Sequence, residues 1–257
     1  MFFSHLPLGQ KLELSPNHVH IWSKNLKSPP SEIEELSKIL SSDEIDRAKK
    51  FHFERDKNRF IIARGTLRKI LSCYLNIEPK KLQFTYSERG KPYLPDTSIL
   101  FNLSHSQDLA LYAITTVNLI GIDLEYIRPM NDAEALAKRF FTSQEYNLIS
   151  QLPPQQQQEI FFKIWTCKEA YLKATGDGLA GGLEKVEVCL KPEQPIQFIS
   201  INGDFQEASR WYLHQFIPES NYIAAVVVAG INQNLSFWQT IELGIEAMFK
   251  DCTRRWI

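Results

Sequence analysis

Hydrophobic and polar residues alternate most regularly between residues 119 and 127, where the sequence reads Leu-Ile-Gly-Ile-Asp-Leu-Glu-Tyr-Ile. An alternation with a period of two predicts a strand with one buried face. Ile122 and Leu124 would lie on the buried face, and Asp123 and Glu125 on the opposite one. Their Cα atoms would be about 6–7 Å apart, so the two carboxylates would repel each other unless a positive group lies between them. A hard cation such as Mg²⁺ is the simplest such group, and a solvated strand face is the alternative.

Short apolar runs elsewhere in the chain predict further strands. They cover residues 18–22, 82–86, 109–116, 186–190, 196–201, 211–217 and 222–229. Only Val117 and Asn118 separate the run 109–116 from the run that carries the acidic pair. These two strands are therefore predicted to form a hairpin.

Apolar residues at helical spacing predict several helices. They cover residues 32–40, 60–74, 133–140 and 159–174. The prolines and glutamines of 153–158 are interpreted as a loop before the last of these helices, and Gly176 follows it as a stop signal. The C-terminal segment 238–257 is predicted to be a closing helix and tail.

Two short segments have the residues that begin helices. Ser41 and Glu44 have the spacing of a capping box, and the helix that they open would turn Ile45, Ala48 and Phe51 inward. Another helix is expected to begin with Thr142 or Ser143 as its N-terminal cap.

Length, composition and charge limit the possible functions. The 257 residues allow one large domain or two small ones, and the net charge of −1 indicates neither a nucleic acid nor a membrane surface as a partner. No run approaches the roughly 18 apolar residues of a membrane span, and the first residues do not have the pattern of a secretion signal. The four cysteines, at 73, 167, 189 and 252, have neither CxxC nor zinc-ligand spacing. They are predicted to be reduced thiols in a cytoplasmic protein.

The segment 47–69 departs from this neutral balance, because it holds nine basic residues and two acidic ones. The helix predicted over 60–74 would carry many of these cations on its outer face. The segment is interpreted either as a solvated helix surface or as a local surface for binding anions.

Two further groups of residues are candidates for chemistry. Trp165, Glu169 and Lys173 are spaced by four residues, so they share one face of the predicted helix 159–174. Glu169 could complete the oxygen shell of a cation while Lys173 meets a phosphate, or the two could form an ordinary surface ion pair. Ser104 and His105 lie beside a predicted strand, where a histidine is either structural or a phosphate contact. The sequence contains no GxSxG, Walker or GxGxxG motif, so ordinary hydrolase, NTPase and dinucleotide-binding functions lack support.

Five short motifs occur in an order that resembles the 4′-phosphopantetheinyl transferase superfamily, in particular its long Sfp-type enzymes. The motifs are Gly90-Lys91-Pro92, Asn102-Leu103-Ser104-His105-Ser106, Gly121-Ile122-Asp123-Leu124-Glu125, Arg139-Phe140-Phe141-Thr142-Ser143-Gln144-Glu145-Tyr146 and Trp165-Thr166-Cys167-Lys168-Glu169-Ala170-Tyr171-Leu172-Lys173. They span about residues 42 to 180. Each motif alone is weak, but the ordered set is specific.

The resemblance implies an α+β protein with two similar α/β subdomains, related by a pseudo-twofold axis, and with the active site in the cleft between them. We place the boundary between residues 1–117 and 118–257. The implied reaction transfers 4′-phosphopantetheine from coenzyme A to a serine of an apo acyl or peptidyl carrier protein and releases adenosine 3′,5′-bisphosphate. The carrier could serve fatty-acid, polyketide or non-ribosomal peptide synthesis. A cytoplasmic monomer is expected.

The resemblance also assigns roles to residues. Asp123, Glu125 and Glu169 would bind Mg²⁺. Lys173 and His105 would contact the phosphates of coenzyme A. These further residues would contact its nucleotide end: Lys91, Ser104 and, at the 3′-phosphate, Arg47.

Two residues depart from the pattern of the family. Glu44 stands at a basic position of a relative, and Phe60 stands where the relative has a hydroxyl. Lys49, Lys50 or Arg59 are therefore alternatives for the contacts with the 3′-phosphate. Glu145 matches a motif acid without an assigned role.

The transfer needs a base for the attacking serine. We predict that Glu169 takes this proton, directly or through a metal-bound water, and that Lys173 is the second catalytic residue. Two other functions are alternatives. The segment 47–69 could belong to a nucleic-acid-binding module, in which the acidic residues would have no role. The same acidic residues could serve a metal-dependent phosphodiester hydrolase.

Overall fold

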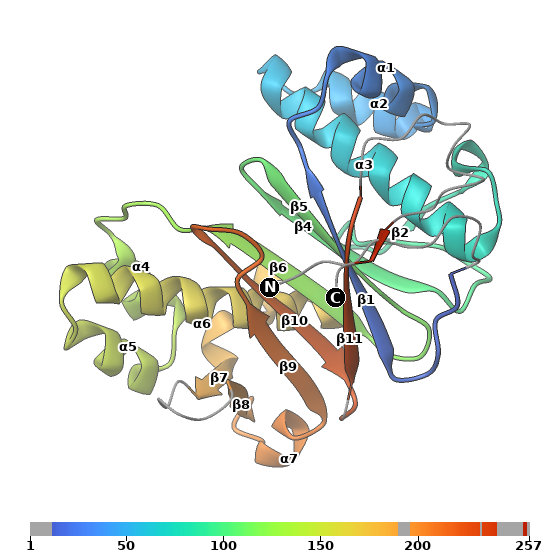
Figure 1. The fold of residues 1–257 in the computed structure, drawn as a ribbon. Coiled ribbons are helices and arrows are strands. Elements are labelled where there is room, and N and C mark those ends of the chain that lie inside the picture. The colour runs from blue at the N-terminus through green and yellow to red at the C-terminus, as the bar shows by residue number, and fades with distance from the viewer. Residues whose placement is uncertain (1–11, 190–195, 232, 241–253, 256–257) are drawn as a thin grey trace.

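Two β-sheets, each packed against its own helices, form the molecule (Figure 1). The structure is a computed structural model, and it describes residues 12–189, 196–231, 233–240 and 254–255. One sheet has five strands in the order β12-β11-β1-β5-β4. These strands are β1 (His18–Asn25), β4 (Leu100–Ser106), β5 (Leu109–Thr115), β11 (Asn234–Gln239) and β12 (Arg254–Arg255). The other sheet has the order β6-β10-β9, with β6 (Ile120–Tyr126), β9 (Trp211–Phe216) and β10 (Tyr222–Ala229).

In each half of the chain, three helices follow the first strand of the sheet. The five-stranded sheet packs against α1 (Pro30–Lys38), α2 (Ser42–Lys49) and α3 (Glu54–Leu75) (Figure 1). The three-stranded sheet packs against α6 (Pro154–Thr175), and α4 (Ala133–Phe140) and α5 (Ser143–Ser150) pack on α6 (Figure 1). Two small hairpins pair β2 (Thr85–Tyr86) with β3 (Pro92–Tyr93) and β7 (Val186–Cys189) with β8 (Gln197–Ile201). The described residues also form the short helix α7 (Phe205–Ala208) and the 3₁₀ turns η1 (Pro79–Lys81), η2 (Gly178–Gly181) and η3 (Leu183–Lys185). The mixture of helices and largely antiparallel sheets confirms the α+β class.

The core lies in layers around the two sheets. Apolar residues of α1–α3 pack on Trp22, Tyr112 and neighbouring strand residues. A second cluster, which includes Ile122 and Leu124, fills the space between the sheets. The buried face predicted for β6 is therefore confirmed.

The predicted hairpin across Val117 and Asn118 is wrong, because β5 and β6 belong to different sheets. One edge of β6 pairs with β10. At its other edge the backbone amides of Ile122, Leu124 and Tyr126 donate to side-chain oxygens of β4 at 2.8, 3.3 and 3.0 Å. The acceptors are Asn102, Ser104 and Ser106. Side chains thus supply at this junction the hydrogen bonds that a strand partner would otherwise supply.

Two other predictions of element bounds are wrong. Pro154 is the first residue of α6, not part of a loop, because a proline fits the first turn of a helix, where its missing N–H has no partner to lose. Trp238 lies in β11, which runs parallel to β1, so the predicted closing helix does not begin there. The rest of that prediction, over 241–253 and 256–257, falls outside the described residues.

The segment 47–69 is less of a basic surface than its sequence predicts. Arg64, Arg68 and Lys69 are buried instead of lying on the outer face of α3. Glu44, whose side chain is also buried, forms ion pairs with Arg64 Nε at 3.0 Å and Arg68 Nε at 2.6 Å. The inward side of α2 is thus formed by Glu44 and Ala48, while Ile45 and Phe51 are exposed, contrary to prediction.

The capping boxes of α2 and α5 are both present. Cys167 and Cys189 are free thiols, as predicted. Cys73 is disulfide-bonded, so the prediction of reduced cysteines is wrong for that residue. No helix among the described residues is both long enough and apolar enough to cross a membrane.

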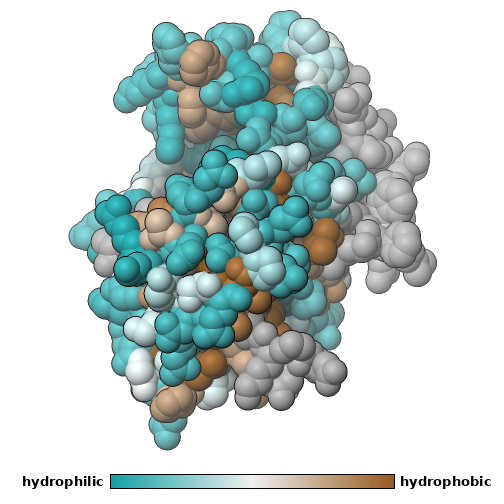
Figure 2. All heavy atoms as spheres, turned by 90° about the vertical axis from the view of Figure 1, so that its left-hand side faces the viewer, coloured by the Kyte–Doolittle hydropathy of each residue, from teal (hydrophilic) through white to brown (hydrophobic). Residues whose placement is uncertain are grey.

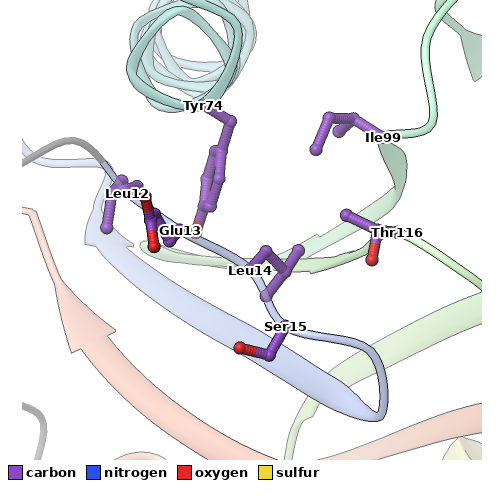
Figure 3. Close-up of a pocket in the computed structure, with 7 residues that line it drawn as sticks. All are labelled: Leu12, Glu13, Leu14, Ser15, Tyr74, Ile99 and Thr116. Carbon is purple, nitrogen blue, oxygen red and sulfur yellow. The ribbon is translucent and has the colours of Figure 1, made fainter.

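The surface has two further features. A cavity of about 340 Å³ opens beside Tyr74, and Figure 3 shows the residues that line it: Leu12, Glu13, Leu14, Ser15, Tyr74, Ile99 and Thr116. On the face in Figure 2, hydrophobic residues lie in scattered groups among hydrophilic ones.

Candidate active site

A glycine brings the acidic strand and the long helix α6 into direct contact. A Cβ atom at Gly121 would lie 2.0 Å from the carbonyl oxygen of Ala170 and 2.4 Å from the amide of Ala174. Only a residue without a side chain allows this approach. It places the C-terminal half of α6, with Glu169 and Lys173, beside Asp123 on β6.

Asp123 is the centre of the resulting cluster. Its buried carboxylate accepts hydrogen bonds at Oδ1 from Lys173 Nζ at 2.6 Å and from the Ser104 hydroxyl at 3.1 Å. Lys173 Nζ also donates to Ser104 Oγ at 2.9 Å. The structure therefore brings together Asp123, Lys173 and Ser104, which lie on three different elements.

Glu125 and Glu169 flank this centre, and each has a raised pKa. Burial and then the negative charge of Asp123 raise the pKa of Glu125 to about 7, and the same two causes raise that of Glu169 to about 6. The charge of Lys173 acts in the opposite direction on both. Glu125 accepts a long hydrogen bond from Ser106 at 3.4 Å. The charge of Asp123 thus acts against the ionisation of both glutamates, and for Glu125 this is the repulsion that the sequence predicts without a cation between the two residues.

The donor set fits a divalent cation. Among the described residues, Asp123 Oδ2 and Glu169 Oε1 are buried oxygens without a hydrogen-bond partner. Buried carboxylate oxygens without partners are costly, and a hard cation that prefers oxygen would satisfy them. Within the same residues, however, no three His, Cys, Asp or Glu side chains already stand close enough to hold a metal ion. Lys173 provides the positive charge next to Asp123 in this structure.

A second part of the site is positive. His105 lies at the end of β4, where part of the residue reaches solvent and the protein surrounds the rest. Desolvation by the surrounding protein, and then the positive charges of Lys173, Arg59 and Arg47, lower its pKa. Three cations from α2, α3 and α6 therefore act on one imidazole, as expected around a phosphate site.

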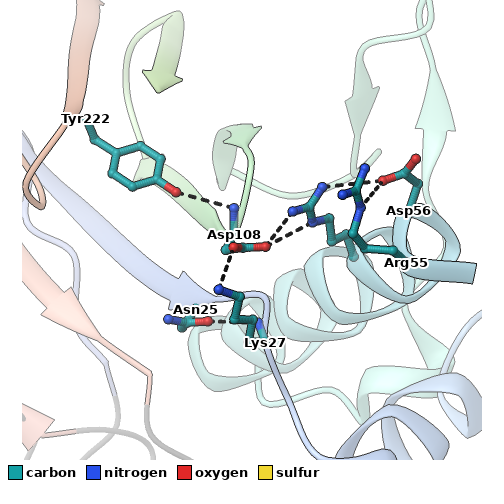
Figure 4. Close-up of polar contacts among 7 residues, drawn as sticks. Asn25, Lys27, Arg55, Asp56, Asp108 and Tyr222 are labelled. Atoms are coloured by element: carbon teal, nitrogen blue, oxygen red, sulfur yellow. Dashed lines mark hydrogen bonds and ion pairs between the residues drawn. The ribbon is translucent and has the colours of Figure 1, made fainter. Parts of the chain in front are cut away.

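Arg59 is held in place by acidic neighbours. Its guanidinium contacts Asp108 Oδ1 at 2.5 and 3.2 Å and Asp56 Oδ1 at 3.4 Å. Lys27 binds the other oxygen of Asp108 at 2.9 Å, and the backbone amide of Asp108 donates to the Tyr222 hydroxyl at 3.3 Å (Figure 4). The turn between β4 and β5 thereby links α3 to β10 beside His105.

Phe60, one of the two departures from the family pattern, is in contact with Arg47. The guanidinium of Arg47 lies over the ring of Phe60, 5.6 Å from its centre. Such a cation–π contact orients the arginine without using its hydrogen-bond donors. Glu44, the other departure, is buried with Arg64 and Arg68 and does not reach this surface.

Lys91 comes close to the site but points elsewhere. Its ammonium donates to the backbone carbonyls of Ile120, Lys173 and Ala174 at 3.1, 2.6 and 3.0 Å. These contacts use its three hydrogens.

The sequence left some supporting residues without a role. Glu145 forms a buried ion pair with Lys168 at 2.5 Å and accepts the amide of Val188 at 2.9 Å. Lys168 precedes Glu169, so the pair fixes the part of α6 that carries the acid. Polar residues at every second position of β4, from Asn102 to Ser106, were the signal for the junction with β6.

Comparison with known proteins agrees with this arrangement. Residues 119–227 match the model of the 4′-phosphopantetheinyl transferase superfamily, and residues 25–117 match that of the N-terminal part of a 4′-phosphopantetheinyl transferase. The chain is 48% identical over 237 residues to the 4′-phosphopantetheinyl transferase HetI of Nostoc sp., which covers 91% of this chain and 97% of that protein.

More distant relatives come from bacilli. Identity is 33% over 158 residues to the 4′-phosphopantetheinyl transferase psf-1 of Bacillus pumilus, covering 61% of this chain and 66% of that protein. Identity to the 4′-phosphopantetheinyl transferase Sfp of Bacillus subtilis is 29% over 160 residues, which cover 62% of this chain and 70% of that protein. The chain belongs to the 4′-phosphopantetheinyl transferase superfamily, in its long Sfp-type branch.

Proposed function

We propose that this enzyme transfers the 4′-phosphopantetheine group of coenzyme A to a serine hydroxyl of an apo carrier protein. The observation that carries the proposal is the meeting of Asp123, Glu169 and Lys173, with unpartnered carboxylate oxygens beside an ammonium group. Membership of the transferase superfamily supports the same reaction. The chemistry requires such a mixed site, because a diphosphate must be bound and its charge compensated.

We assign Asp123, Glu125 and Glu169 as the residues that would hold Mg²⁺. Bound there, the ion would compensate the negative charge that develops on the departing diphosphate oxygen. The unpartnered oxygens of Asp123 and Glu169, together with the raised pKa values of Glu125 and Glu169, support this assignment.

The positive part of the site is assigned to coenzyme A. Lys173 and His105 would contact the diphosphate, and Arg47, with Arg59 as its neighbour, would face the 3′-phosphate. Ser104 would help to hold the nucleotide end of coenzyme A, and its hydroxyl would also orient Asp123 and Lys173, which it contacts. The combined charges of Lys173, Arg59 and Arg47 at His105 support an anion at this place.

The transfer itself is a displacement at phosphorus. The serine oxygen of the carrier forms a bond to the β-phosphorus of coenzyme A, and the bond from that phosphorus to the bridging oxygen breaks. Adenosine 3′,5′-bisphosphate leaves with the bonding electrons, and Glu169 receives the serine proton.

The two halves of the chain are proposed to be pseudo-twofold equivalents. In each, the first strand pairs with the last and the last pairs with the one before it, in the orders β1-β5-β4 and β6-β10-β9. In each, a capping-box glutamate pairs with a cation of a 22-residue helix, as in Glu44–Arg68 and Glu145–Lys168. The two matched family models meet at the predicted boundary between 117 and 118. Since both halves of one chain surround the site, we propose a monomer.

The test is incubation of the full chain with coenzyme A, MgCl₂ and an apo carrier protein, followed by mass spectrometry of the carrier. A gain of one phosphopantetheine per carrier is expected, and it should disappear with EDTA. Parallel reactions with fatty-acid, polyketide and peptidyl carriers identify the preferred class. Release of phosphopantetheine to water without a mass gain would instead identify a hydrolase and overturn the proposal.

A further inference from the structure

The hairpin of β2 and β3 presents Lys91 on a fixed backbone. Gly90 has a φ of +80°, a conformation that glycine adopts without strain. The Lys91 amide donates to Ser87 Oγ at 3.1 Å, and its carbonyl accepts from the Ser87 amide at 2.9 Å. The direction in which the Lys91 side chain leaves the turn is thus set by the turn itself.

The Lys91 ammonium ends at the C-terminus of α6. The last carbonyls of a helix have no partner within the helix. Lys91 Nζ donates to two of them, the carbonyl oxygens of Lys173 and Ala174, at 2.6 and 3.0 Å. A positive charge also suits the C-terminal end of a helix dipole. Lys91 therefore caps the helix turn that carries Lys173.

The third carbonyl bound by Lys91 belongs to Ile120, at 3.1 Å. Ile120 precedes Gly121, the residue on which α6 rests without an intervening side chain. Lys91 therefore ties the strand and the helix together across the contact that brings Lys173 to Asp123.

The hairpin is anchored at both of its ends. Tyr86 accepts a hydrogen bond from Arg64 at 2.6 Å and donates to Asp43 at 3.3 Å, which fixes it to α2 and α3. Arg89 donates to the carbonyl of Asp177, just beyond α6. The N-terminal helices and the end of α6 are thus connected through one short hairpin.

We propose that Lys91 is a positioning residue, which clamps the end of α6 onto β6 and so holds Lys173 and Glu169 beside Asp123. It acts through these residues and does not itself bind the nucleotide, which was the role implied by the family resemblance. The catalytic consequence of this clamp rests on the proposed transferase function; the clamp itself does not.

The test compares hydrogen exchange and transfer kinetics in the wild type and in Lys91→Met. In the ligand-free protein, amides at the end of α6, including Gly176, which donates to Leu172 at 2.9 Å, should exchange about tenfold faster in the variant. Turnover with an apo acyl carrier protein should fall by about tenfold or more at saturating coenzyme A. Arg89→Met is the matched control, since its contact lies beyond the helix, and its exchange within α6 should stay near that of the wild type.

The outcomes separate the two roles. Faster exchange together with lower turnover supports the clamp. Weaker coenzyme A binding by calorimetry, with exchange unchanged, would assign Lys91 to the nucleotide and overturn the proposal. If the methionine variant does not fold, Lys91→Gln, which keeps two donors, should show intermediate exchange, and wild-type exchange in it overturns the clamp. A wild-type protein that transfers nothing would refute the transferase function while the exchange measurement still tests the clamp.

Discussion

Lys173 Nζ lies 2.6 Å from Asp123 Oδ1, although one residue belongs to the last turns of α6 and the other to the middle of β6. Asp123 is 4% exposed, so water contributes little to balancing its charge. The neighbouring ammonium of Lys173 provides the compensating positive charge. Both residues are also groups that we propose as contacts of Mg²⁺ and of the diphosphate. We therefore expect the pair to stabilise the empty site and to be partly replaced when substrate is bound.

Replacing Lys173 with methionine should reduce turnover strongly. The variant removes the charge next to Asp123 and a phosphate contact, so kcat/KM for coenzyme A should fall by about 10²–10³-fold. Steady-state transfer to an apo carrier protein measures the effect. Lys163→Met on the same helix is the control, because its ion pair with Glu159 is exposed and should contribute little. Equal effects of both substitutions would contradict a specific role for Lys173.

Glu169→Gln tests the assignment of the base. The amide has nearly the same shape but cannot take up the serine proton, so kcat should fall by about 10²–10⁴-fold. Binding of coenzyme A in the presence of Mg²⁺ by calorimetry shows whether the site is still occupied. Near-normal turnover with the site occupied would exclude Glu169 as the base.

The acidic centre could be predicted because its signals are local. The alternation around Asp123 and the helical spacing of Glu169 and Lys173 are set by the geometry of single elements. Their assembly was available only through the family resemblance, because contacts between distant elements leave no periodic pattern in the sequence. Gly121 is an example: the sequence shows a glycine, and only the packing of α6 gives its reason.

The errors arose where tertiary contacts override local patterns. The run of cations in 47–69 predicts a charged surface, but Arg64 and Arg68 are buried and compensated by Glu44, which is 24 residues from Arg68 along the chain. The hairpin at Val117 and Asn118 failed because β6 meets side chains of β4 at the edge where a partner strand was expected. Lys91 carried no signal for its three carbonyl contacts, since any lysine after a glycine turn looks alike in sequence.

Substitutions of the two buried capping-box glutamates, Glu44 and Glu145, should affect stability alike and catalysis differently. Glu145→Gln leaves buried Lys168 without its counter-charge, and Glu44→Gln leaves buried Arg64 and Arg68 without theirs. Each substitution should cost about 3–5 kcal/mol in the free energy of unfolding. Glu145→Gln should also lower kcat, because Lys168 adjoins Glu169. Glu44→Gln should mainly raise the KM for coenzyme A, since α2 carries Arg47. Urea unfolding and steady-state kinetics measure both effects, and identical kinetic changes in the two variants would contradict this division.

The raised pKa values of Glu125 and Glu169 determine how stability depends on pH. The ordinary value is 4.5, and burial with the charge of Asp123 raises the pKa to about 7 for Glu125 and about 6 for Glu169. Between pH 4.5 and 7 the folded protein therefore holds protons that the unfolded chain has released. The contribution of these groups to the free energy of unfolding must fall as pH rises through this range.

Glu125→Gln should remove the larger part of this dependence. With EDTA present, the variant should gain about 1–3 kcal/mol relative to the wild type when pH is raised from 5 to 8, because each unit of pKa shift corresponds to about 1.4 kcal/mol. Urea unfolding of both proteins at the two pH values measures the difference. Mg²⁺ with coenzyme A should reduce it, since a bound cation stabilises the ionised carboxylates of the wild type. A difference between the two proteins that does not change with pH would contradict a raised pKa for Glu125.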